Sequence, residues 1–123
     1  DIFLRNKSYD DTNIFSKILR GEVPCEKVFE SEYTLAFRDI YPKAPTHVLV
    51  IPKKHYVSLN DFSDKADIEE LSDIFKTILA VVEIEGIKNT GYRVTTNTGR
   101  DANQEVKHLH FHVIGGRKLG RSD

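Results

Sequence analysis

Apolar residues recur three and four positions apart in the middle of the chain. Five of them follow this spacing: Ile68, Leu71, Ile74, Ile78 and Val82. The period is typical of an amphipathic helix, because side chains three and four apart lie on the same side of a helix. The pattern predicts one long helix from Lys65 to about Ile87, packed with one face on a sheet.

A shorter helix is predicted from Ile14 to Arg20. The side chain of Thr12 or Asn13 can accept a hydrogen bond from a backbone N–H at the helix start, and Gly21 can end the helix. Residues 1–11 mix charges without any pattern. We therefore expect a flexible N-terminal arm over residues 1–11, followed by a single domain over residues 12–123.

Five stretches rich in β-branched and aromatic residues predict strands. Their expected bounds are Lys27–Glu30, Tyr33–Ile40, His47–Ile51, Tyr92–Thr96 and Val106–Ile114. Mostly short links join neighbouring strands, which favours antiparallel pairing over βαβ crossovers. The predicted fold class is α+β, with about five antiparallel strands, one long helix and one short N-terminal helix.

The composition excludes several classes of protein. The chain has 123 residues and a mass of 14.1 kDa, which corresponds to one domain. Its 18 Lys and Arg residues against 19 Asp and Glu residues leave a net charge of −1, so it lacks the basic surface that binds nucleic acid non-specifically. No apolar run approaches the ~20 residues of a membrane helix, and we expect a cytoplasmic protein that contacts no membrane. Because the chain contains no Met, we expect a start residue or a longer leader to precede it.

Three of the five histidines alternate with apolar residues in the run His108-Leu109-His110-Phe111-His112-Val113. Successive side chains of a strand point to opposite faces, so the three imidazoles would share one face and the apolar residues would reach the core. One histidine on a strand is usually structural or exposed. Three on one face favour a functional site.

Two chemistries suit such a row. Imidazole is a common ligand of zinc and copper, but His108 and His112 would lie ~13 Å apart along a strand, which strains a single ion held by all three. Two histidines with a remote ligand stay possible. Neutral imidazole is also a nucleophile near pH 7, so the row could supply a nucleophile, a positioning group and a proton donor to an anionic centre.

The row also matches a known family motif. Residues 108–114 resemble the histidine-triad signature, His-x-His-x-His followed by apolar residues. The similarity continues in the same order through further segments: Asn13–Ile18, Leu35–Ile40, Pro45–His55 and Gln104–Arg117. It covers nearly all of residues 12–120. The chain is identified as a member of the histidine triad nucleotide-binding (Hint) branch of the HIT superfamily.

The resemblance implies a catalytic role for four histidines. His110, in the middle of the row, would attack the α-phosphorus of a nucleotide and carry the nucleotidyl group. His112 would contact the phosphate and help the leaving group to depart. His108 would orient the nucleophile, partly through its backbone carbonyl, and His47 would support the site from below.

The resemblance also implies a nucleotide-binding set. Asp39 would bind the ribose hydroxyls, with Ile40 beside the sugar and base. The apolar walls around the purine would be Phe15, Ile18 and Phe37. The contacts to the phosphate and leaving group would come from Asn97, Asn103, Gln104 and Glu105. The residues by themselves leave Phe37 open as plain core, Asp39 as a turn residue and Asn97 as a loop residue.

Some positions depart from relatives in the superfamily. His112 stands where the nucleotidyl-transferase branch has Gln, which favours a hydrolase. Asn13 and Ser16 stand where some bacterial relatives carry the Cys-x-x-Cys of a structural zinc site, so no metal is predicted. The single cysteine, Cys25, cannot form an internal disulfide and is expected to be a packed thiol.

The phosphate loop differs as well. Ala102-Asn103 replaces the usual Gly-Gly before Gln104. Glu105 stands where vertebrate members carry Ser, and its negative charge would favour a basic amine over an anionic leaving group.

The sequence therefore predicts a purine nucleoside phosphoramidase without a cofactor. It would cleave the P–N bond of a purine nucleotide substrate through a nucleotidyl-His110 intermediate. The alternatives are a dinucleoside polyphosphate hydrolase, a nucleotide-binding interaction protein with incidental activity, and a metal-binding module. The resemblance further implies a homodimer, with the long helix and the fourth strand near the two-fold axis.

Overall fold

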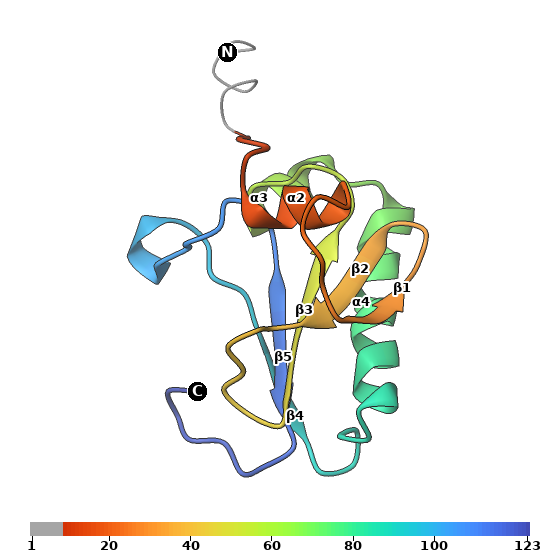
Figure 1. The fold of residues 1–123 in the computed structure, drawn as a ribbon, viewed down its shortest axis with the longest axis vertical. Helices are drawn as coiled ribbons and strands as arrows, with labels where there is room; N and C mark the ends of the chain where they lie inside the picture. Colours follow the sequence, from red (N-terminus) through yellow and green to blue (C-terminus); the bar gives the residue numbers. More distant parts are fainter. Residues whose placement is uncertain (1–8) are drawn as a thin grey trace.

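The central strand of the molecule, β3 (Thr46–Pro52), is buried along its whole length. It pairs antiparallel with β2 (Thr34–Arg38) on one side and with β5 (Phe111–Gly115) on the other. The strands β1 (Lys27–Glu30) and β4 (Tyr92–Thr95) complete the sheet in the order β1-β2-β3-β5-β4 (Figure 1). This computed structural model describes residues 9–123. The predicted α+β fold with a five-stranded antiparallel sheet is confirmed.

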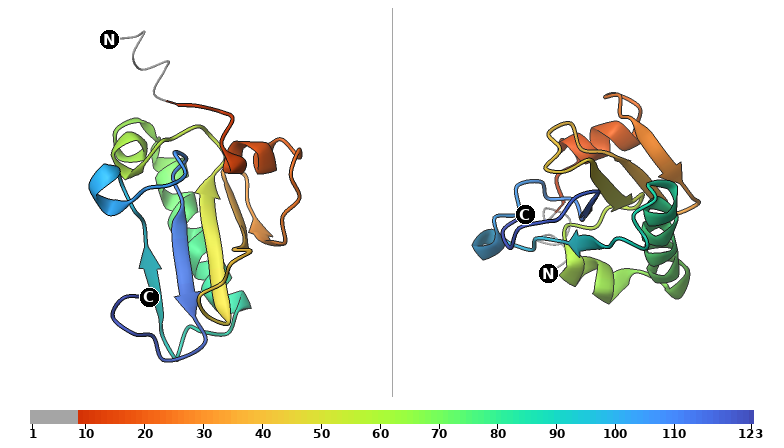
Figure 2. Two further views of the ribbon diagram at one scale, coloured as in Figure 1. Left: turned by 60° about the vertical axis from the view of Figure 1, so that its left-hand side comes forward. Right: turned by 90° about the horizontal axis from the view of Figure 1, so that it is seen from below.

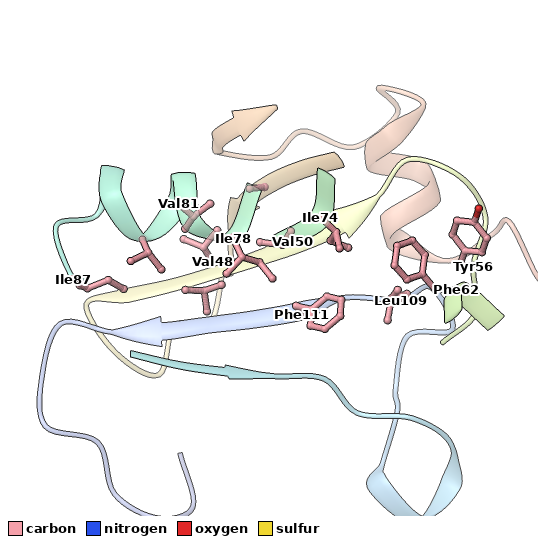
Figure 3. Packing of buried hydrophobic residues seen from close by; sticks show 13 residues of the cluster. Val48, Val50, Tyr56, Phe62, Ile74, Ile78, Val81, Ile87, Leu109 and Phe111 are labelled. Atoms are coloured by element: carbon pink, nitrogen blue, oxygen red, sulfur yellow. The ribbon is translucent and has the colours of Figure 1, made fainter. Parts of the chain in front are cut away.

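Both faces of the sheet are covered. The helix α4 (Ile68–Ile84) packs along one face (Figure 2), where Val48 and Val50 join the larger core cluster (Figure 3). The alternate residues Leu49 and Ile51 point to the other face and pack with Phe15 of the short helix α2 (Ile14–Leu19). Because both sets of side chains are buried, β3 reads as a continuous apolar run rather than an alternating one.

The long helix predicted from Lys65 to Ile87 is present as α4, three residues shorter at each end, and a separate short helix precedes it. α3 (Leu59–Lys65) ends at Ala66, and α4 begins after Asp67. Asp67 starts the second helix because its carboxylate accepts the backbone N–H of Glu70, while the Glu70 carboxylate accepts the N–H of Asp67. The sequence analysis missed α3 because this helix buries only Phe62, which gives no apolar period to detect.

The last strand is shorter than predicted. Only Phe111–Gly115 pairs with neighbouring strands, whereas residues 106–110 lie outside the sheet. Their backbone groups bond elsewhere: the N–H of Leu109 donates to the carbonyl of Tyr56, and the carbonyl of His110 accepts the hydroxyl of Thr96. The prediction that one strand carries all three histidines is therefore wrong, although the side chain of Leu109 still points into the core.

Most of the N-terminal arm predicted at residues 1–11 lies outside the described residues. From Tyr9 onward the chain has defined contacts. The ring of Tyr9 stacks on the ring of His55 at a centroid distance of 4.3 Å, and Asn13 caps α2 by accepting the N–H of Ser16 at 2.9 Å. No helix within residues 9–123 has the length and apolar character needed to cross a bilayer.

Two isoleucines of α4 give a matched test of the core. Ile74 is fully buried, whereas Ile68 in the first turn is 76% exposed, although both belong to the periodic pattern. Ile74→Ala should lower the free energy of unfolding by about 2–5 kcal/mol because it leaves a cavity, and Ile68→Ala should change it by less than about 0.5 kcal/mol. Urea denaturation measures both values, and equal losses would contradict this packing.

Candidate active site

A pocket of about 660 Å³ lies on the α2 side of the sheet. Its walls come from α2, from the segment between α2 and β1, from the link between β2 and β3, and from the loop before β5. These segments meet because β3 lies between β2 and β5 in the sheet. The volume falls within the range of roughly 300–1,000 Å³ that is common for small-molecule sites.

All but one of the site residues predicted from the sequence line this pocket. They are Phe15, Ile18, Phe37, Asp39, Ile40, His47, Asn97, Asn103, Gln104, Glu105, His110 and His112. The exception is His108, which is fully buried, with the rings of Tyr9 and Phe15 edge-on to its imidazole.

The backbone orients the ring of His110. Its Nδ1 lies 2.8 Å from the carbonyl oxygen of His108, and a carbonyl only accepts, so Nδ1 carries the proton and Nε2 holds the lone pair. Nε2 has no hydrogen-bond partner within residues 9–123. Every fully buried side-chain nitrogen or oxygen of those residues does have one. Nε2 of His110 is therefore accessible from the pocket.

The ring of His112 has the opposite proton arrangement. The N–H of Lys43 donates to Nδ1 of His47 at 3.1 Å, so the proton of His47 lies on Nε2. This Nε2 is 2.9 Å from Nδ1 of His112, which must accept, and the proton of His112 then lies on its own Nε2. The imidazoles of His110 and His112 are 5.2 Å apart. One ring offers a lone pair to the pocket, and the other offers an N–H donor.

Burial keeps these imidazoles neutral. Removal from water lowers the pKa of His108 to about 4. It also lowers the pKa of His112 to about 4, with a further contribution from the neighbouring rings of His110 and His47. The pKa values of His110 and His47 are lowered for the same reason, although the carboxylate of Asp39 acts in the opposite direction on both. A neutral His110 can act as a nucleophile at pH 7.

Apolar side chains form the wall beside the histidines. Phe15 packs edge-on against His110 at 4.9 Å between ring centroids and against Phe37 at 5.7 Å. Phe37 belongs to the smaller core cluster and also lines the pocket, so it is both a core residue and part of the pocket wall. Ile40 stands at the rim with 80% of its surface exposed. Surfaces of this kind suit the flat face of an aromatic ligand.

Asp39 makes both a turn contact and a site contact. Its Oδ1 accepts the N–H of Tyr41 at 2.8 Å, which is the turn interaction expected after a strand. Its Oδ2 lies 3.4 Å from Nε2 of His47. Asp39, His47 and His112 each offer one ligand atom, and these atoms lie within 4.8 Å of one another. An ion bound there would have to replace the proton that His47 donates to His112.

The loop before β5 is held in shape by its own polar groups. Asn103, in place of a family glycine, adopts φ 58° and ψ 46°, a left-handed conformation that Asn tolerates better than most residues. The buried side chain of Gln104 accepts the N–H of Gly99 at 3.0 Å and donates to the carbonyls of Val57 and Val106. The amide of Gln104 is thus fully used within the protein.

The other two predicted residues of this loop, Asn97 and Glu105, differ in their hydrogen bonding. The side chain of Asn97 donates to the carbonyl of Ala102 at 2.9 Å. Glu105 is exposed at the pocket, and its negative charge favours the protonated form of His110. Of the two, Glu105 is the residue that adds charge to the rim of the pocket.

Two of the pocket residues that were not predicted from the sequence, Lys43 and Cys25, bear on its chemistry. Lys43 fixes the ring of His47 through its backbone N–H, and no side-chain pattern signals a backbone donor. Cys25 is exposed and lines the pocket, so the expectation of a packed thiol is wrong. It lies in the segment between α2 and β1, which forms one wall of the pocket rather than part of the core.

Residues 20–119 match the family model of the HIT domain. A HIT-like protein of Azospirillum brasilense is 54% identical over 114 residues, which cover 93% of each chain. The purine nucleoside phosphoramidase of Escherichia coli K12 is 43% identical over 110 residues, 89% of this chain and 92% of that protein.

Solved structures agree with this assignment. A histidine triad protein from Clostridium difficile has a TM-score of 0.83 and 46% identity, over 91% of this chain and 96% of that chain. A HIT family hydrolase from Legionella pneumophila has a TM-score of 0.82 and 44% identity, and the match covers 89% of this chain and 96% of that chain.

A histidine-lined pocket on one side of a five-stranded antiparallel sheet defines a protein of the histidine triad class. The chain belongs to the HIT family. Its relatives include proteins described as hydrolases. The matched domain begins at Arg20, so α2 and the segment before it lie outside the match.

Burial of the imidazoles should make stability depend on pH. An unfolded histidine titrates near 6.5, whereas His108 titrates at about 4 in the folded protein. Between these values the unfolded chain binds more protons, so the stabilisation is complete above pH 6.5 and is lost as the pH falls toward 4. His108 alone should lower the free energy of unfolding by about 3 kcal/mol between pH 7 and pH 4, because each unit of pKa shift corresponds to about 1.4 kcal/mol.

Urea denaturation at several pH values between 7 and 4 measures this loss. The variant His108→Asn, which has no titrating ring, should show a shallower dependence than the wild type. A wild-type free energy of unfolding that stays constant over the whole interval would contradict the burial of neutral histidines.

Proposed function

We propose that this protein hydrolyses the P–N bond of purine nucleoside phosphoramidates through a covalent nucleotidyl-His110 intermediate. The proposal rests on the different proton positions of two adjacent rings. The lone pair on Nε2 of His110 is accessible from the pocket, and Nε2 of His112 carries a proton. One ring can attack phosphorus while the other donates a hydrogen bond to the phosphate or to the departing group.

The nucleotide would occupy the pocket with its base on the apolar wall. Phe15, Ile18 and Phe37 supply that wall, and aromatic surfaces stack on a base whatever its edge pattern. Asp39 at the strand end can accept hydrogen bonds from the two ribose hydroxyls, as acidic residues do in dinucleotide sites. This arrangement directs the α-phosphate toward His110.

The chemistry proceeds in two displacements at phosphorus. Nε2 of His110 attacks the α-phosphorus, the P–N bond breaks, and the expelled amine takes up a proton that reaches it through the site. The imidazole of His110, now carrying the nucleotidyl group, keeps its Nδ1–H bond to the carbonyl of His108. Water then cleaves the new P–N bond and returns one proton, so the products are a nucleoside monophosphate and the amine. No step requires a metal.

The charge at the rim favours an amine as the leaving group. Glu105 is exposed at the pocket, and its carboxylate attracts a leaving group that is a basic amine and repels one that is an anionic phosphate. The relative from Escherichia coli that shares 43% of its residues with this chain carries the name purine nucleoside phosphoramidase. Both observations support a phosphoramidate over a dinucleoside polyphosphate.

The substitution His110→Ala tests the intermediate. It should lower the turnover of adenosine phosphoramidate by about four to six orders of magnitude, because the nucleophile is removed. Rapid quench with labelled substrate should trap an acid-labile nucleotidyl group on the wild type and none on the variant. Thermal unfolding and calorimetric titration with a nucleoside monophosphate serve as controls, and both should stay close to the wild type.

Other outcomes of the same assay would select another function. Turnover of a diadenosine polyphosphate alone would indicate the polyphosphate hydrolase. Tight nucleotide binding without turnover of either substrate would indicate an interaction protein. Loss of wild-type activity in the presence of a chelator would indicate an ion at Asp39, His47 and His112.

We also propose that the protein acts as a homodimer through β4 and α4. β4 is an edge strand of the sheet, and it exposes Tyr92 and Val94. On α4, Phe75 is 63% exposed and Leu79 is 43% exposed. The ring centroid of Phe75 lies 6.4 Å from that of Phe111 on β5, the strand that pairs with β4. A free strand edge and a nearby apolar helix face are the features that a second copy of the chain can cover.

Light scattering should give a mass near twice 14.1 kDa for the wild type. Leu79→Glu should shift the protein toward the monomer, because the interface would bury an unpaired charge. Ile68→Glu on the same helix changes an exposed residue outside this surface and should leave the mass unchanged. A monomeric wild type at micromolar concentration would rule out the dimer.

A further inference from the structure

The side chain of Tyr9 lies between two imidazoles. Its ring stacks on His55 at a centroid distance of 4.3 Å with 9° between the planes, and it meets His108 edge-on at 5.7 Å. The hydroxyl is 2.6 Å from Nδ1 of His108 and 3.2 Å from the amide nitrogen of Asn13, and it also bonds to the hydroxyl of Ser16. Tyr9 thus joins the segment before α2 to the first residue of the histidine row.

The direction of these hydrogen bonds follows from the far side of His108. Its Nε2 lies 2.9 Å from the carbonyl oxygen of Pro52, which only accepts, so Nε2 carries the proton and Nδ1 does not. The Tyr9 hydroxyl must then donate to Nδ1. The amide of Asn13 donates to the Tyr9 oxygen in turn. These contacts assign the proton in each hydrogen bond of the series that runs from Asn13 through Tyr9 and His108 to Pro52.

The surroundings of His108 keep this ring neutral. The groups that face it are the Tyr9 hydroxyl, the ring of Phe15, the carbonyl of Pro52 and the imidazoles of His55 and His110. None of these groups carries a negative charge that would favour an imidazolium, and burial disfavours it. Donation from Tyr9 acts in the same sense, since a protonated Nδ1 could not accept it.

The backbone carbonyl of His108 is the group that contacts the ring of His110. Residues 106–110 lie outside the sheet, so no ladder of strand hydrogen bonds holds the backbone of His108. The carbonyl of this residue nevertheless accepts the Nδ1–H of His110 at 2.8 Å. The Leu109 N–H of the same peptide unit donates to the carbonyl of Tyr56 at 2.7 Å. The imidazole of His108, tied at one nitrogen to Tyr9 and at the other to Pro52, is a second anchor for the residue that carries this carbonyl.

We propose that Tyr9 is a positioning residue for His110: its hydroxyl fixes the ring of His108, and the carbonyl of His108 then holds the ring of His110 with Nε2 toward the pocket. The proposal extends the site to a residue outside the matched domain, which begins at Arg20. Its catalytic consequence rests on the phosphoramidase function proposed above.

The substitution Tyr9→Phe isolates the hydroxyl, because the ring can still stack on His55. Heteronuclear NMR of nitrogen-labelled imidazoles should show Nδ1 of His108 moving toward the shift of a nitrogen without a hydrogen bond, together with a change at Nδ1–H of His110. The kcat for adenosine phosphoramidate should fall about three- to tenfold, the effect of one lost hydrogen bond, with KM unchanged within about twofold. Such a split between kcat and KM, with altered ring signals, is not expected from a loss of stability alone.

Two further variants complete the comparison. Tyr33→Phe removes the hydroxyl of a tyrosine that lines a different pocket, beside α4, and should behave as the wild type in both measurements. Ser16→Ala removes one partner of the Tyr9 hydroxyl and should move the His108 signal in the same direction by a smaller amount, which provides a readout if Tyr9→Phe does not fold.

The outcomes separate this inference from the proposed function. Wild-type turnover with unchanged His108 and His110 signals and an unchanged kcat in Tyr9→Phe would overturn the role of Tyr9 and leave the phosphoramidase intact. Altered ring signals in Tyr9→Phe with a wild type that hydrolyses no phosphoramidate would support the positioning role and overturn the proposed function. Equal effects of Tyr33→Phe and Tyr9→Phe would also overturn the role of Tyr9.

Discussion

The antiparallel pairing of β3 with β5 is the contact on which both the core and the pocket depend. It places Val50 opposite Phe111 on the side of α4, and Leu49 opposite His112 on the side of the pocket. A shift of this register by one residue would exchange the two faces of β5 and send His112 into the core. The apolar residues of the row therefore fix the position of the histidines, because only one register buries them.

The chemistry of the pocket depends on backbone groups more than on side-chain identity. Four of the five histidines line or adjoin the site. His110 carries its proton on Nδ1 and the other three carry it on Nε2, and backbone groups fix this directly for three of the four rings. Pro52 and His108 supply carbonyls, and Lys43 supplies an N–H. A buried imidazole nitrogen without a hydrogen-bond partner would destabilise the fold. Every fully buried side-chain nitrogen or oxygen within residues 9–123 does have a partner. Neutral rings with fixed tautomers are thus compatible with a stable interior.

Departures from the family pattern are accommodated locally. Asn103 in place of glycine still adopts the left-handed conformation that the loop before β5 requires, and Gln104 ties that loop to neighbouring backbone. Asn13 and Ser16, where some relatives carry cysteines, contact the hydroxyl of Tyr9. In both places a polar side chain that can hydrogen-bond to its surroundings keeps the backbone next to the site in a defined shape.

The sequence by itself determined the fold class, the five strands and the short capped helix, and it indicated part of the pocket lining. Periodicity is a local property that survives in a single sequence, and it indicated the helices and strands. The site residues came from the resemblance to the histidine-triad family, and all of them except His108 line the pocket. The short helix α3 was missed because it buries only Phe62 and so carries no apolar period. The tertiary structure decided which nitrogen of each imidazole is free, where β5 ends, that Cys25 is exposed, and that Tyr9 reaches His108. Some of these contacts join groups far apart in the sequence, as those between His47 and His112 and between Tyr9 and His108 do. Others join near neighbours, such as His110 and His108, but no pattern along the sequence encodes the direction of a hydrogen bond.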